Sequence, residues 1–185
     1  MPMQSVLPYF FIVGSEVAFW LVLLLGLAVR YLLQREAASR WLLRSLPLVD
    51  LVLLAATAWH LQAGATATFA HGLAAVYVGF TVVFGAFVVR WADTRFAHRF
   101  AGGPRPQTAP RTGWRDVRFE LALWARCIAA WIIALALIEA LTAYVGNAAT
   151  TQPLRAWYRY ALGSVFVWLI FGPGWSLVFF RREAR

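Results

Sequence analysis

Four ionisable residues lie within or beside long apolar segments of the chain: Glu16, His60, His71 and Glu139. Their charged forms would be costly in such surroundings. A charged side chain at the centre of a bilayer costs about 2.5–3.5 kcal/mol on insertion scales, so such residues are functional candidates. The order of the segments puts all four in the outer third of a membrane. Two imidazoles and two carboxylates can relay protons, hold a cation or polar solute, or ligate a divalent metal. We predict that they form an outward-facing pocket.

Other interpretations of these four residues remain open. His60 and His71 flank a short connection, so they could be ordinary interfacial histidines. Each glutamate could instead make a polar contact with a neighbouring helix. A specific metal site has little support, because no HExxH or similar ligand spacing is present. A haem between His60 and His71 could be held only at the rim, because both belong to one tight hairpin. The sequence requires no cofactor.

A second pair of opposite charges lies deeper in the apolar segments. Asp50 and Arg126 each lie about two helical turns from the inner surface, at about 1.5 Å per residue. Matching depth predicts a buried ion pair, acting as an inner gate or as a structural lock. The alternative is that Arg126 extends to the membrane surface and leaves Asp50 protonated. Further along, Gly172, Pro173 and Gly174 predict a kink in the last helix.

Five apolar segments must position these residues. A spanning helix needs about 20 mainly apolar residues, and the segments that qualify cover residues 9–33, 41–61, 68–90, 119–145 and 157–180. The second is the weakest, because Arg44, Pro47 and Asp50 interrupt it. We therefore predict an all-α fold, a single transmembrane domain of five helices over residues 1–185.

Composition supports a membrane protein. The chain of 185 residues is 62% hydrophobic and 14% charged, where soluble domains average about 45–50% apolar and about 25% charged residues. The net charge of +9 comes from arginines, which are concentrated in alternate connections. That pattern predicts an outside N-terminus, a cytoplasmic C-terminus and a basic cytoplasmic loop over residues 91–118. The arginines form no module that reads nucleic acid.

Catalysis is not expected. Cys127 is the single cysteine, which excludes an intrachain disulfide, a CxxC redox pair and a thiolate metal cluster. The chain has no HExxH motif and only three histidines, too few for a di-iron desaturase. We assign no catalytic residue.

Three short stretches carry a resemblance to a known group. The run Phe69-Ala70-His71-Gly72-Leu73-Ala74-Ala75, the triplet Trp91-Ala92-Asp93, and the run Arg99-Phe100-Ala101-Gly102-Gly103-Pro104 resemble small bacterial multi-pass membrane proteins of the YmcC type. The resemblance covers mainly the third helix and the loop after it. It implies a location in the bacterial inner membrane and brings no activity with it.

The sequence thus supports two functional hypotheses. The first is a protein that binds or transports a small cation or polar solute through the predicted Glu/His pocket. The second is a non-catalytic accessory, assembly or scaffold protein whose basic loop docks a partner or anionic lipid. The lipid bilayer is the expected surrounding in both cases. Five spans are few for a stand-alone transporter, so a homo-oligomer or a larger membrane complex is compatible with either hypothesis.

Overall fold

The chain folds into long helices and short helical turns. The structure is a computed structural model that describes residues 3–106 and 113–180, with side chains in the first helix described at Gly14 and from Val17 onward. Its elements are α1 (Met3–Tyr31), α2 (Glu36–Arg44), α3 (Leu46–Gln62), α4 (Phe69–Phe100), α5 (Gly113–Val145), α6 (Ala148–Thr151), η1 (Gln152–Arg155), α7 (Ala156–Leu169), η2 (Ile170–Gly174) and α8 (Trp175–Val178). The described part of the chain contains no strand, which confirms the all-α prediction.

Four helical segments are long and apolar enough to cross a bilayer: Glu36–Gln62, Phe69–Phe100, Gly113–Val145 and Ala148–Val178. The described apolar part of α1, Val17–Tyr31, is shorter than a span. The whole of α1 has 29 residues, about 43 Å of helix. A membrane bundle with four spanning helices is therefore confirmed, and the fifth crossing, by α1, stays a prediction.

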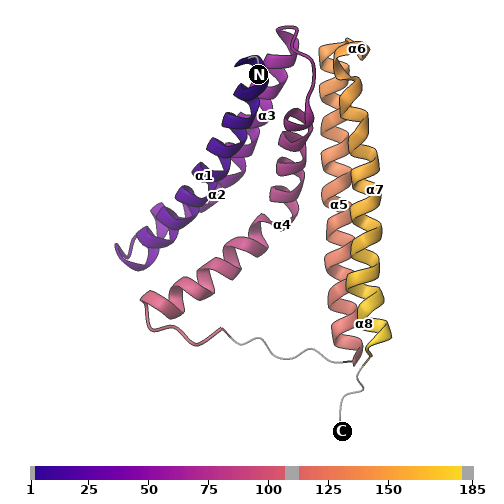
Figure 1. Cartoon of the computed structure of the whole chain (residues 1–185). Coiled ribbons are helices and arrows are strands. Elements are labelled where there is room, and N and C mark those ends of the chain that lie inside the picture. The colour runs from indigo at the N-terminus through magenta and orange to yellow at the C-terminus, as the bar shows by residue number, and fades with distance from the viewer. Residues whose placement is uncertain (1–2, 107–112, 181–185) are drawn as a thin grey trace.

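The helix connections gather at two ends of the molecule (Figure 1). The start of α1, the α3–α4 connection and α6 lie at one end, which we call the histidine end because His60 and His71 flank the α3–α4 connection. The α1–α2 connection, the end of α4, the start of α5 and α8 lie at the other, which we call the arginine end. The connections therefore alternate between the histidine end and the arginine end, in agreement with the side-by-side spans that the sequence predicts.

Helix α4 lies between α1–α3 on one side and the pair of α5 and α7 on the other (Figure 1). It meets α5 through small residues: a Cβ added at Gly79 would lie 2.5 Å from the carbonyl oxygen of Ala130 and 3.1 Å from the Cβ of Ala134. Small residues let two helix backbones approach closely, which is the main source of packing energy between helices in lipid. Past this contact, the second half of α4 inclines toward α1, where Val89 and Phe96 pack near Leu27.

The second predicted span, residues 41–61, is helical except at Ser45, where α2 gives way to α3. Pro47 lies in the first turn of α3, where a missing N–H leaves no helical hydrogen bond unmade. The buried residues of α3 then recur at helical spacing along one face: Leu46, Asp50, Leu53, Thr57 and Leu61. That face packs against α4 and α1, so Asp50 is inside the protein.

Two predicted boundaries are wrong. The basic loop was expected over residues 91–118, but α4 stays helical to Phe100 and α5 begins at Gly113. No glycine or proline lies between Gly85 and Gly102, and α4 ends just before Gly102, which has a φ of +64°. The last span was expected from residue 157 but begins at Ala148, because the Asn147 side chain accepts hydrogen bonds from the N–H groups of Ala149 and Thr150 and caps the helix there.

The last span contains a 3₁₀ turn near its start and a π-helical turn near its end. The residues expected to kink it, Gly172, Pro173 and Gly174, belong to the π-helical turn Ile170–Gly174. Proline has no N–H to donate to the carbonyl four residues earlier, so a regular α-helix cannot continue through it. Single π turns of this kind locally widen a helix.

Candidate functional site

His60 and His71 are hydrogen-bonded at the histidine end. The Nδ1 atom of His60, near the end of α3, lies 2.9 Å from the Nε2 atom of His71, in the first turn of α4. Their rings are nearly parallel, with 5.2 Å between centroids and 11° between planes. His71 is buried, with 2% of its surface exposed, and His60 is half-buried. The short connection thus brings the two histidines together as expected.

Thr68 fixes the protonation pattern of the pair. Its backbone N–H donates to His71 Nδ1 at 3.1 Å, and its hydroxyl oxygen lies 2.9 Å from the same nitrogen. The hydroxyl also accepts from the backbone N–H of His71, which completes a capping box. Because Nδ1 accepts a backbone N–H, neutral His71 carries its proton on Nε2 and donates it to His60 Nδ1. Neutral His60 then carries its own proton on Nε2.

Glu139 lies on α5 and faces α7. Its Oε1 accepts a hydrogen bond of 2.6 Å from the Tyr158 hydroxyl, and the carboxylate is exposed. A cavity of about 60 Å³ adjoins this contact, room for a few waters at most. It is lined by Ile138, Glu139, Thr142, Ala148, Thr151, Leu154, Arg155 and Tyr158. Glu139 is therefore part of a small polar site at the histidine end.

The two polar sites are linked through the backbone. The N–H of Ala67 in the α3–α4 connection donates to the carbonyl of Thr150 at 2.8 Å. Thr151, the next residue along the chain, lines the Glu139 cavity. The α3–α4 connection is thus hydrogen-bonded to the segment beside Glu139.

The structure does not describe the side chain of Glu16, the fourth predicted member of the pocket. It does not support the metal and haem alternatives. Glu16 belongs to α1, but its side chain lies outside the described residues. Among the described side chains, no three of the His, Cys, Asp and Glu type lie close enough to hold a metal ion, so His60, His71 and Glu139 do not form a metal site by themselves. A bis-histidine haem does not fit either, because Thr68 and His60 engage both ring nitrogens of His71.

The predicted ion pair between Asp50 and Arg126 is not formed. Asp50 is 4% exposed and hydrogen-bonds with the side chain of Thr81 on α4, while its Oδ2 has no partner in the described part of the chain. Arg126 is exposed on α5, and its neighbour Cys127 is the residue that faces the core. Successive residues on a helix point about 100° apart, so equal depth did not guarantee that the two charges face each other.

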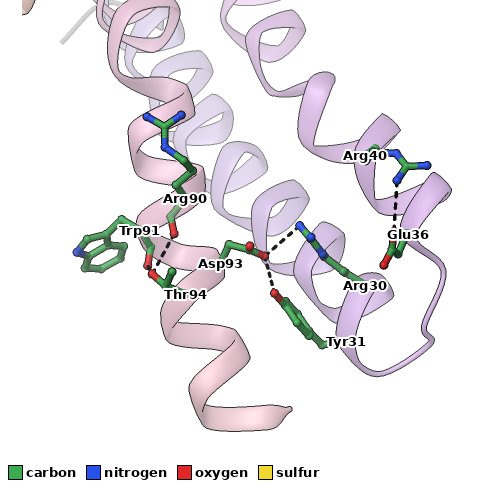
Figure 2. A network of polar contacts seen from close by, with 8 residues as sticks. All are labelled: Arg30, Tyr31, Glu36, Arg40, Arg90, Trp91, Asp93 and Thr94. Atoms are coloured by element: carbon green, nitrogen blue, oxygen red, sulfur yellow. Dashed lines mark hydrogen bonds and ion pairs between the residues drawn. The ribbon is translucent and has the colours of Figure 1, made fainter. Parts of the chain in front are cut away.

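Sequence reasoning missed a polar cluster at the arginine end. Asp93 of α4 forms an ion pair of 3.3 Å with Arg30 and accepts a hydrogen bond of 2.9 Å from the Tyr31 hydroxyl, both at the end of α1 (Figure 2). The Tyr31 ring also stacks on Phe96, with 5.7 Å between centroids. Asp93 was expected in or beside the basic loop, either solvated or paired with a nearby arginine. The absence of any glycine or proline between Gly85 and Gly102 was the signal that it belongs to a helix.

One comparison with known proteins returned a strong relative. The chain is 37% identical over 144 residues to the uncharacterized membrane protein YmcC of Bacillus subtilis (strain 168), and the matched region covers 77% of each chain. No family model matches the chain, and no solved structure matches it.

Proposed function

The chain belongs to the YmcC family of bacterial membrane proteins, and we propose that it binds or transports a small cation or polar solute in a proton-linked manner. Its four spanning helices and this relationship make it a multi-pass protein of a bacterial cytoplasmic membrane. The observation that carries the proposal is the 2.9 Å hydrogen bond between His60 and His71.

A proton added to the histidine pair must break one of its contacts. The neutral pair already holds one proton on each Nε2 atom. A third proton on His60 Nδ1 would face the Nε2–H of His71, and one on His71 Nδ1 would face the backbone N–H of Thr68. Protonation therefore costs either the bond between the histidines or the cap of α4. Proton binding by the pair is therefore coupled to the contacts that hold the start of α4.

The solute site that we propose is the carboxylate of Glu139. The charged groups of the described elements at the histidine end are Glu139, Arg155 and Arg159, besides the two histidines. Glu139 is exposed and adjoins a cavity of about 60 Å³, a size that suits a small cation or a few waters. The Ala67–Thr150 hydrogen bond then offers a route by which release of the α4 cap alters the surroundings of Glu139.

Reconstitution tests this function. We suggest proteoliposomes loaded with a fluorescent pH indicator and exposed in turn to K⁺, Mn²⁺ and choline as probes. Proton movement that depends on one probe is the expected result, and His60→Asn and His71→Asn should each abolish it. His98→Asn is the matched control, because His98 lies at the arginine end and bonds only to the Gly103 carbonyl. Proton movement that survives both substitutions, or its absence with every probe, would contradict the proposal.

An accessory role is the second candidate, and the length of α4 favours it. The helix has 32 residues, about 48 Å, which exceeds the hydrocarbon core of about 30 Å. Its last turns carry exposed Arg90, Arg95 and Arg99, and Arg95 lies over the Trp91 ring at 4.0 Å. A basic helical surface of this kind can dock an acidic partner or anionic lipid. Under this hypothesis, Arg95→Gln with Arg99→Gln reduces recovery of a co-purifying partner, whereas the histidine substitutions leave it unchanged.

A further inference from the structure

A second and larger cavity lies toward the arginine end. It has a volume of about 530 Å³, is open on one side, and is lined by α1, the junction of α2 and α3, and α4. Arg40 and Arg44 of α2 line one part of it, and Thr81 and Gly85 of α4 line another. We propose that this cavity binds one anionic phospholipid from the leaflet at the arginine end. The phosphate would lie at Arg40 and Arg44, and an acyl chain would lie along α4. This inference does not depend on the histidine pair.

The body of the cavity suits a hydrocarbon chain. Apart from the arginines and Thr81, its lining is apolar, with Leu46 fully buried and Val82 exposed on the outward side. Gly85 keeps the space open, because a Cβ added there would meet only Thr81 Cγ2, at 3.5 Å. Ligand cavities of about 300–1,000 Å³ are typical of small-molecule sites. Because α3 and α4 are spanning segments, a cavity between them opens to lipid.

The two arginines suit a phosphate. They are four residues apart on α2, hence on the same face one turn apart. Arg40 pairs with Glu36 at 3.3 Å (Figure 2), but both side chains are largely exposed, and exposed pairs of this kind contribute little energy. Arg44 has no polar partner in the described part of the chain. Guanidinium groups bind phosphate oxygens with two parallel hydrogen bonds, so phosphate can replace the Glu36 contact.

The depth of the arginines matches a headgroup. Trp41, between them in sequence, is 73% exposed, and Trp91 of α4 is also exposed at the arginine end. Exposed tryptophans gather where a bilayer meets water. The arginines therefore lie at headgroup level, and the apolar lining extends from them toward Thr81 in the membrane interior. With two arginines against one glutamate, the site favours an anionic lipid over a zwitterionic one.

Lipid exchange on the full-length protein tests the proposal. The purified protein would be incubated with equal amounts of phosphatidylglycerol and phosphatidylcholine, and the retained lipid would be counted by native mass spectrometry. We expect retained phosphatidylglycerol to exceed phosphatidylcholine. Arg40→Gln and Arg44→Gln should each lower phosphatidylglycerol binding about fivefold. Arg126→Gln is the control, since Arg126 is exposed on α5 but does not line the cavity.

A cavity-filling variant separates a built site from ordinary lipid contact. Gly85→Leu should displace the bound lipid, while Gly163→Leu should retain it, because Gly163 has open space around it on an exposed part of α7. Ala86→Phe, which also projects into the cavity, gives the same readout if Gly85→Leu unfolds. Equal retention of the two lipids by the wild type would overturn the proposal. Undiminished phosphatidylglycerol binding by the filled variants would overturn it as well.

Discussion

His71 is the most constrained side chain of the candidate site, because both of its ring nitrogens are engaged. The chain has only three histidines, so selective ¹⁵N-histidine labelling gives a spectrum that can be assigned by substitution. In nanodiscs at neutral pH, we expect His71 as the Nε2–H tautomer, with a coupling across the hydrogen bond to His60 Nδ1. Acidification that protonates the pair should remove that coupling. His71 found as the Nδ1–H tautomer would contradict the assignment.

Gly72 offers a second prediction for a single residue. A Cβ at this position would overlap the indole ring of Trp157. Gly72→Ala should therefore destabilise the protein by about 1–3 kcal/mol, the usual cost of overpacking. Gly163→Ala is the matched control, because nothing lies within 4 Å of its added Cβ, and it should be neutral or slightly stabilising. Thermal unfolding in one detergent measures both variants, and equal melting temperatures would show that Trp157 moves aside freely.

Individual residues show which contacts could be predicted from the sequence and which could not. The contact of His60 and His71 could be predicted, because a short connection leaves their helix ends no freedom to separate. The pairing of Asp50 with Arg126 could not, because depth along an axis says nothing about rotation around it, and packing of Cys127 into the core turns Arg126 outward. The role of Thr68 as the N-cap of α4 could have been predicted, because a threonine directly before an apolar helix is a typical N-cap.

At the scale of helices, Asp93 ties the end of α1 to α4. Tyr31→Phe removes one hydrogen bond and should cost about 0.5–1.5 kcal/mol. Arg30→Gln should cost less, because the Arg30 side chain is 38% exposed and solvent screens the pair. Glu36→Gln, which breaks only the exposed contact with Arg40, is the control. Equal losses of thermal stability for Tyr31→Phe and Glu36→Gln would show that Asp93 holds no structural link.

The presence of the helices was predicted more accurately than the residues at which they begin and end. The apolar segments fix where helices must be, since every backbone polar group in lipid needs an internal partner. Their ends depend on local signals: Gly102 stops α4 and Asn147 starts α6. Arg95 and Arg99 belong to α4, although the basic loop was expected to begin at residue 91. Charge marks the surface of a membrane, and a helix can continue past that surface into water.

Besides the small cluster of Leu53, Ala70 and Ala74, the described part of the molecule has two apolar cores with different neighbours. The larger core joins α3, α4, α5 and α7 and includes Leu61, Trp131 and Trp157. The smaller one joins α1, α3 and α4 around Leu23, Leu27 and Leu46. Helix α4 belongs to both, so it is the element through which the histidine pair at its start and the arginine-lined cavity along its second half would influence each other.

The orientation of this arrangement follows from the arginines and can be tested with one labelling series. Connections rich in arginine stay in the cytoplasm, so we expect the arginine end inside and the histidine end outside. Cys127 is the only cysteine and is buried, so Cys127→Ala gives a background free of thiols. In that background, Ala63→Cys, in the α3–α4 connection, should react with a membrane-impermeant maleimide in intact cells. Ala101→Cys, just after α4, should react only after lysis, since both positions are exposed to solvent. The reverse labelling pattern would show the opposite orientation, with the histidine pair and Glu139 on the cytoplasmic side.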